Sequence, residues 1–90
     1  MANQEHLAVV KGGPESIATW REANPGVALD LEGVDLSGAD LRQCKIRNAN
    51  LSGASLAGAL LVRASLAGAD LTNANLEGAD MGRATLTGAN

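Results

Sequence analysis

The sequence repeats every five residues between positions 31 and 86. A large aliphatic residue fills each fifth position without interruption, at Leu31, Leu36, Leu41, Ile46, Leu51, Leu56, Leu61, Leu66, Leu71, Leu76, Met81 and Leu86. Two positions before each of these stands a second series, which opens with Leu29 and Val34, includes Cys44 and is otherwise alanine. A single unit of five cannot bury its own aliphatic side chain, so this repetition predicts a solenoid of stacked copies.

A period of five residues excludes both an α-helix and a flat strand. On an α-helix, five residues rotate the side-chain direction by about 500°, so the leucines would scatter around the axis. On a flat strand, an odd period would send successive leucines to opposite faces. Both apolar series share one interior only if the chain is extended for about three residues and then turns. The period therefore predicts a coil.

The residues that follow each leucine by two positions agree with such turns. Gly or Asn occupies nine of these twelve positions, and the other three are Gln43, Arg63 and Arg83. Gly and Asn tolerate the backbone angles of tight turns. Four right-angled corners close one circuit, which gives coils of 20 residues at 29–48, 49–68 and 69–88. With ~4.8 Å between coils, the stack is expected to be about 15 Å tall.

The pattern A-(D/N)-L-x-x resembles the pentapeptide-repeat family. It occurs, for example, as Ala39-Asp40-Leu41, Ala49-Asn50-Leu51 and Ala79-Asp80-Met81, and the resemblance covers about two thirds of the chain. It implies an all-β solenoid, namely a right-handed quadrilateral β-helix of about three coils, to which we add a short N-terminal helical cap. Functions in this family range from topoisomerase protection by DNA mimicry to members without an assigned activity, so the resemblance leaves the function open.

Residues 1–28 are expected to cap the first coil, because an open coil end exposes unpaired backbone and apolar side chains. The apolar run at 7–10 is interpreted as a short strand. Gly13-Pro14-Glu15 is typical of a helix start and Asn24-Pro25-Gly26 of a helix end, which predicts a helix at about 14–23. Ile17 and Trp20 lie three apart, share a face of that helix and are expected to anchor it on the coil mouth.

The other end of the repeats raises two alternatives. The chain reaches Ala89-Asn90 as a thirteenth unit begins. Either this end meets a partner, or the sequence is a piece of a longer chain. The preferred hypothesis is an end-to-end homodimer, because one two-fold operation would cover both open mouths.

The sequence offers no set of residues for catalysis or metal binding. His6 is the only histidine, lacks Cys or acidic residues at ligand spacing, and is given no role. Cys44 falls in the inward series and is interpreted as a core thiol. No nucleophile, base and orienting residue can be combined. We therefore expect a noncatalytic protein without metal or cofactor.

Charge and hydropathy limit the partners and the location. The net charge of −3 and the absence of a basic face argue against direct nucleic-acid binding. No apolar run is long enough to span a bilayer, and no signal-peptide pattern is present. The sequence therefore favours a soluble cytoplasmic protein that binds no membrane.

One local break in the polar-outside pattern marks a candidate interaction patch. Leu60 and Val62 fall on outward positions, and Arg42, Arg63 and Arg83 are assigned to the same side of the coil. A small apolar patch with a basic rim is typical of a contact surface. The competing interpretation is that isolated exposed aliphatic residues are ordinary.

Two functions follow as hypotheses. The first is a structural or protein-interaction module with an unknown protein partner. The alternative, implied by the family resemblance, is a DNA-mimicking modulator of a type II topoisomerase. That alternative needs a long acidic surface, whereas a stack of about 15 Å covers fewer than about five base pairs at ~3.4 Å per pair.

Overall fold

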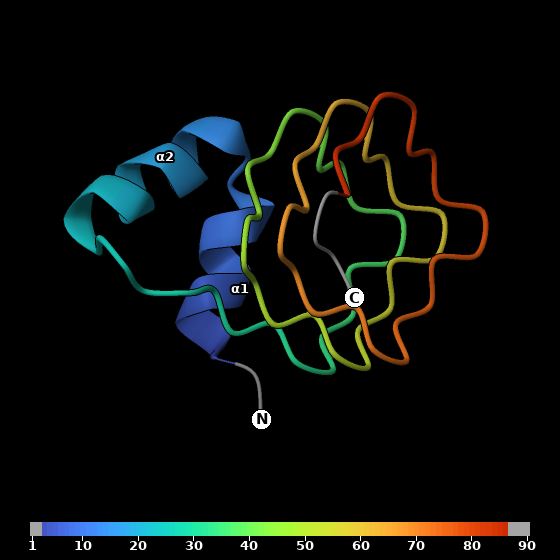
Figure 1. Ribbon diagram of the computed structural model, residues 1–90, viewed down its shortest axis with the longest axis horizontal. Helices are drawn as coiled ribbons and strands as arrows, with labels where there is room; N and C mark the ends of the chain where they lie inside the picture. Colours follow the sequence, from blue (N-terminus) through green and yellow to red (C-terminus); the bar gives the residue numbers. More distant parts are fainter. Residues whose placement is uncertain (1–2, 87–90) are drawn as a thin grey trace.

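The protein consists of two short helices followed by a coiled chain. The structure, a computed structural model, describes residues 3–86. Helix α1 spans Gln4–Lys11 and helix α2 spans Pro14–Ala23, and both lie at one end of the coil (Figure 1). The expected thirteenth unit at Ala89 and the last residues of the expected third coil lie outside the described residues.

The coil advances by 20 residues per circuit. Eight parallel bridges each join residues 20 apart, at Asp30↔Asn50, Asp35↔Ser55, Asp40↔Leu60, Lys45↔Ser65, Asn50↔Asp70, Ser55↔Asn75, Leu60↔Asp80 and Ser65↔Thr85. Four bridging positions per circuit give the coil four sides. Only one residue per side pairs, because a turn follows every short extended segment, so the described part of the coil is a β-solenoid of isolated bridges without continuous strands.

The corners of the coil lie in the left-handed backbone region. Gly53, for example, has φ of 69°. Three of these corners carry long side chains instead of glycine, with φ of 64° at Gln43, 61° at Arg63 and 58° at Arg83. A residue with a Cβ is disfavoured there by roughly 1–2 kcal/mol, whereas glycine is not. The backbone at these three corners is therefore strained.

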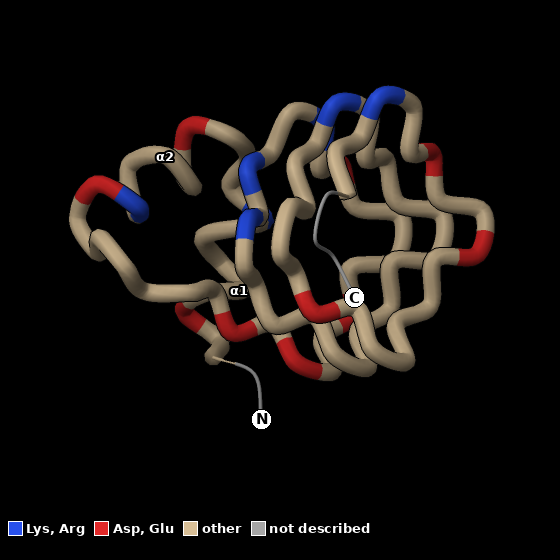
Figure 2. Tube along the Cα trace, in the orientation of Figure 1, with Lys and Arg blue, Asp and Glu red and all other residues tan. Residues whose placement is uncertain are grey.

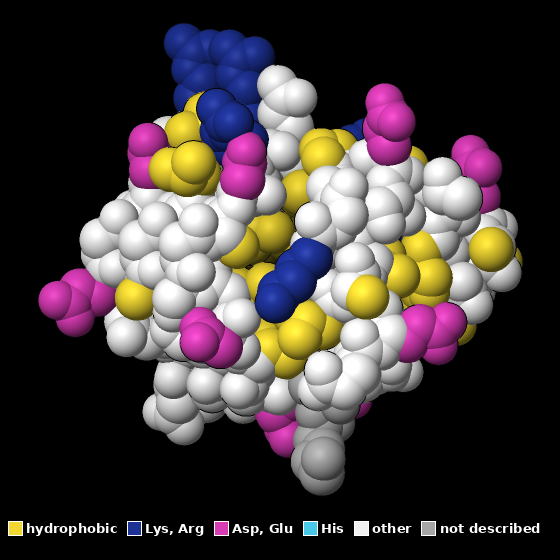
Figure 3. Space-filling model, turned by 180° about the vertical axis from the view of Figure 1, so that it is seen from behind, with side chains coloured by type: hydrophobic (Ala, Val, Ile, Leu, Met, Phe, Trp, Pro, Cys, Tyr) yellow, Lys and Arg dark blue, Asp and Glu magenta, His cyan; other side chains and the backbone are white. Residues whose placement is uncertain are grey.

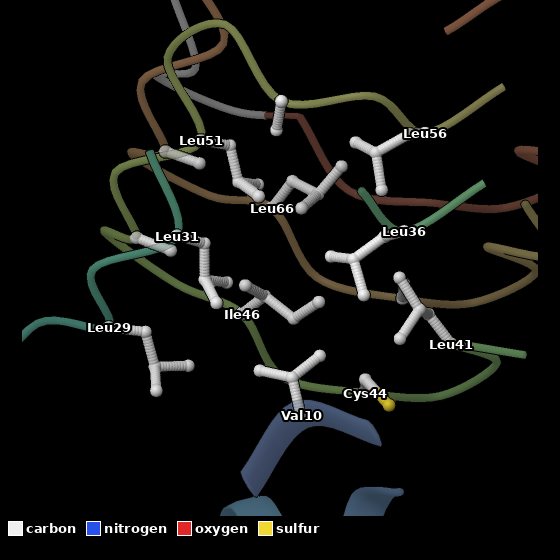
Figure 4. Close-up of a cluster of buried hydrophobic side chains, with 14 of the residues drawn as sticks. Val10, Leu29, Leu31, Leu36, Leu41, Cys44, Ile46, Leu51, Leu56 and Leu66 are labelled. Carbon is white, nitrogen blue, oxygen red and sulfur yellow. The ribbon is translucent and has the colours of Figure 1, made fainter. Parts of the chain in front are cut away.

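The interior of the coil is filled by the two apolar series. In the first two coils the large aliphatic residues are buried, namely Leu31, Leu36, Leu41, Ile46, Leu51, Leu56, Leu61 and Leu66. Equivalent residues of successive coils lie next to each other, as Leu51 does beside Leu31 (Figure 4). Burial declines in the third coil, where Leu71, Leu76 and Met81 are only partly buried and 44% of Leu86 is exposed.

The strand expected at 7–10 is wrong, because these residues belong to helix α1. The side chain of Asn3 caps this helix by accepting hydrogen bonds from the backbone N–H groups of Glu5 and His6. His6 and Val10, four residues apart, are the buried residues of the helix. Val10 points into the mouth of the first coil (Figure 4). The segment is therefore a helix that buries two residues at helical spacing, although its run at 7–10 has the apolar composition of a strand.

The helix expected at 14–23 is present as α2. Pro14 occupies its first turn, where the missing N–H costs no hydrogen bond. Ile17 is fully buried in the core, and Trp20 is partly buried against it. Both residues expected to anchor the cap therefore contact the core.

Candidate functional site

The apolar residues of the candidate patch lie on one side of the coil between charged neighbours. Bridges place Leu60 directly between Asp40 of the first coil and Asp80 of the third. Leu60 is 37% exposed, and Val62 is partly buried. Leu60 therefore has an aspartate on either side along the stack. The rim predicted from the sequence consists of three arginines and does not include these two acidic neighbours.

Arg42 is already paired within the first coil. Its Nε and Nη2 atoms donate to the two carboxylate oxygens of Asp40 at 2.8 and 2.7 Å. These hydrogen bonds lower the pKa of Asp40 to about 2. A bidentate pair of this kind holds both charges in one orientation. Arg42 therefore contributes little free positive charge to the patch.

Arg63 and Arg83 remain available at the edge of the patch. They occupy equivalent corners of the second and third coils, and both are exposed. Figure 2 shows two basic segments on neighbouring coils along this edge. Leu60, Val62, Arg63 and Arg83 thus share one side of the second and third coils, and we name these four residues the third-side patch.

Most Asp and Asn residues of the repeats serve the backbone of their own turn. Their Oδ1 atoms accept a hydrogen bond from the N–H two residues later, as in Asp35 to Ser37 at 3.0 Å and Asn50 to Ser52 at 3.1 Å. The Thr72 hydroxyl also donates to Asp70 and is the main cause of the lowered pKa of that carboxyl group. These acidic residues are therefore part of the turn structure.

A second surface lies between α2 and the first coil. Arg21 donates from Nε to the carbonyl oxygen of Lys45 at 3.1 Å and from Nη2 to that of Arg47 at 3.0 Å. Burial, followed by the positive charge of Arg47, lowers the pKa of Arg21. No sequence signal points to this cluster, because Arg21 lies outside the repeats, 24 residues before Lys45 and 26 before Arg47.

His6, to which the sequence assigns no role, has a structural one. It is 9% exposed, and its Nδ1 accepts a hydrogen bond from the backbone N–H of Asp30 at 2.9 Å. Its ring packs edge-on against Trp20, with 4.9 Å between centroids. His6 therefore connects α1, α2 and the first coil.

Cys44 is a free, fully buried thiol in the core cluster. Burial raises its pKa, which lowers the fraction of reactive thiolate. Within residues 3–86, no group of three or more His, Cys, Asp and Glu residues could hold a metal ion. In the same part of the chain, neither helix is long and apolar enough to cross a bilayer.

Comparison with known families agrees with this coil. A family model described as pentapeptide repeats matches eight copies, at residues 29–61 and 49–88. The chain belongs to the pentapeptide-repeat family. The resemblance inferred from the A-(D/N)-L-x-x pattern is thereby confirmed. Among curated proteins there is no significant match.

Solved pentapeptide-repeat structures share the coil. One from the thylakoid lumen of Arabidopsis thaliana is 43% identical over 67% of this chain and 45% of its own, with a TM-score of 0.55. One from the cyanobacterium Cyanothece 51142 is 32% identical over 68% of this chain and 52% of its own, with a TM-score of 0.56. This pentapeptide-repeat chain therefore spans about half the length of these two relatives.

A third structure is that of HetL, a pentapeptide-repeat protein involved in heterocyst differentiation regulation in Nostoc sp. strain PCC 7120. It is 36% identical over 68% of this chain and 38% of its own, with a TM-score of 0.44.

Proposed function

We propose that this pentapeptide-repeat protein is a noncatalytic interaction module that binds a partner protein through the third-side patch. We take its solenoid to be the right-handed quadrilateral β-helix of about three coils that the family resemblance implies. In this proposal the coil is a rigid support, and the specificity lies in the few outward residues that depart from the repeat pattern.

The strained corners carry the proposal. Arg63 and Arg83 have φ of 61° and 58°, where glycine would remove a cost of roughly 1–2 kcal/mol for each residue. Long charged side chains at both positions therefore lower the stability of the coil locally. Backbone strain of this kind is concentrated at functional sites. Here Arg63 follows the exposed Leu60 by three residues, and Arg83 follows Asp80, the bridge partner of Leu60, by three residues.

The composition of the patch suits a protein partner. Leu60 and Val62 supply apolar area, and the two guanidinium groups can each donate several hydrogen bonds. Interfaces are enriched in arginine and apolar side chains near their centres. DNA mimicry remains the alternative hypothesis, but the bidentate pairing of Asp40 with Arg42 and the exposed arginines beside it do not favour that function.

The test compares two substitutions at equivalent register positions. Leu60→Asn introduces a residue that the coil already accepts at Asn50 and Asn75, where it caps its own turn. Ser55→Asn introduces the same residue at the equivalent position on the adjacent side of the second coil and serves as the control, at the loss of the hydrogen bond between the Ser55 and Ser37 hydroxyl groups. Tagged proteins are used to capture partners from an extract, and the captured proteins are quantified by mass spectrometry.

We expect at least one partner that the wild type and Ser55→Asn both retain and Leu60→Asn loses. Arg63→Gly should also lose this partner while raising the melting temperature. Equal capture by Leu60→Asn and Ser55→Asn would contradict the proposal. A supercoiling assay with a type II topoisomerase addresses the alternative function separately.

A further inference from the structure

A groove runs between the helical cap and the first coil. It comprises a pocket of about 450 Å³ beside Lys11 and a smaller one of about 250 Å³ beside α2, and both are lined by Pro14 and Gln43. Figure 3 shows a hollow between coil and cap in which apolar side chains are exposed and one basic side chain lies across them. We define the cap groove by Lys11, Pro14, Ala18, Arg21, Gln43 and Lys45.

The cap groove concentrates positive charge in a protein whose net charge is −3. Lys11, Arg21 and Lys45 line it, and within the described part of the chain none of them lies within ion-pair distance of a carboxylate. Asp40 also lines the groove, but its charge is balanced by Arg42. Glu15 is the one other acidic residue among the lining residues. The groove therefore favours an anionic ligand.

The pocket beside α2 is apolar. Pro14, Ile17 and Ala18 line it from the helix, and the long side chains of Arg21 and Lys45 border it. Its volume of about 250 Å³ is smaller than the roughly 300–1,000 Å³ typical of small-molecule sites. No aromatic side chain is among its lining residues, so it lacks the stacking surface that single-stranded nucleic acids use. Its dimensions suit one apolar side chain.

We propose that the cap groove binds a short acidic segment of a partner protein, with one apolar side chain in the pocket beside α2. Flanking carboxylates of that segment pair with Lys45 on one side of the pocket and with Lys11 on the other. Arg21 adds positive charge from the border of the pocket while its Nε and Nη2 atoms hold α2 on the coil. This site is separate from the third-side patch, and its test is independent of that proposal.

The charge complementarity has a physical reason. Lys11, Arg21 and Lys45 line the groove, and Glu15 is its one acidic lining residue that is not paired with an arginine. An acidic ligand supplies the missing negative charge, and its apolar side chain gains burial in the same contact. An apolar centre with a polar rim is the usual anatomy of a protein interface.

The probe is a labelled peptide in which one phenylalanine is flanked by two glutamates on each side, with both termini blocked. Binding to the full chain is measured by fluorescence polarisation at low salt. Two control peptides replace the glutamates by glutamine or the phenylalanine by serine. We expect both controls to bind at least about fivefold more weakly than the probe.

Protein variants locate the site. Lys45→Gln and Lys11→Gln should each weaken binding about two- to fivefold, as expected for the loss of an exposed ion pair. Ala18→Glu places a carboxylate in the pocket and should weaken binding about tenfold or more, whereas Thr19→Glu, on the same helix outside the pocket, should not.

Thermal unfolding of each variant is measured to check that the cap remains folded. The proposal is overturned if the wild type fails to bind the acidic peptide, or if Lys45→Gln and Lys11→Gln both bind it as tightly as the wild type does. It is also overturned if Ala18→Glu and Thr19→Glu have equal effects. A labelled single-stranded oligonucleotide is tested in the same assay. If it binds more tightly than the peptide and its binding depends on Lys45 in the same way, the groove binds nucleic acid and the peptide proposal is refuted.

Discussion

Replacing Leu51 by alanine tests whether the stacked interior stabilises the protein. Leu51 is fully buried and occupies the register position between Leu31 and Leu71. Removing such a side chain costs about 2.7–5 kcal/mol, because the transfer free energy is lost and a cavity remains between coils that cannot collapse independently. A chain of 90 residues has a total stability of about 5–13 kcal/mol. Leu51→Ala should therefore remove a large share of the free energy of unfolding.

Leu86→Ala is the matched control. It makes the same chemical change in the third coil, where 44% of the side chain is exposed, so it should cost only about 1 kcal/mol. Urea denaturation is followed by circular dichroism for the coil and by fluorescence of Trp20, the only tryptophan, for the cap. Both probes should give the same midpoint for a cooperative unit. Equal losses for the two variants would refute the reasoning, because they would mean that burial does not determine stability in this coil.

Three further predictions concern titration, thiol reactivity and assembly. In an NMR titration, Asp40 should titrate near pH 2, and Arg42→Gln should raise its pKa toward the ordinary value of about 3.9. The pKa of Asp40 is lower in the folded than in the unfolded protein, so the stabilisation from this pair is present above about pH 4 and is lost as the pH falls through about 2. An unchanged titration midpoint of Asp40 in Arg42→Gln would exclude the Arg42 side chain as the cause. Cys44 should react with a thiol reagent only at the rate of unfolding, and rapid labelling under native conditions would contradict its burial. The end-to-end homodimer remains a prediction, and the partial exposure of Leu71 and Met81 in the third coil favours it. Sedimentation at increasing protein concentration should show dimers of the wild type, and Met81→Glu should abolish them.

The periodicity determined the coil because it leaves the backbone few choices. Leu and Ala two positions apart must face the same interior, and only a coil with corners satisfies this over twelve units. The resulting 20-residue circuit could therefore be predicted from residue types alone. The absence of continuous strands from the described coil follows from the same short period, because one residue per side is left for pairing.

Features that depend on contacts between distant segments were not predictable in this way. The run at 7–10 has the composition of a strand, and only its packing on the coil mouth shows why His6 and Val10 face the core as a helix. The cap groove combines Arg21 with Lys45 across 24 residues, and no periodic signal connects them. Likewise, the sequence placed Arg42 on the rim of the patch, whereas its hydrogen bonds to Asp40 become visible only in the structure.

The pairing of every bridge across 20 residues constrains how the length of this protein can change. Inserting or deleting one residue within a coil would shift all later leucines out of the interior and leave their amides opposite the wrong carbonyls. Adding or removing a whole circuit of 20 would restore each contact. Viable length variants should therefore differ by complete circuits, and engineered lengthening of the coil should proceed in the same increments.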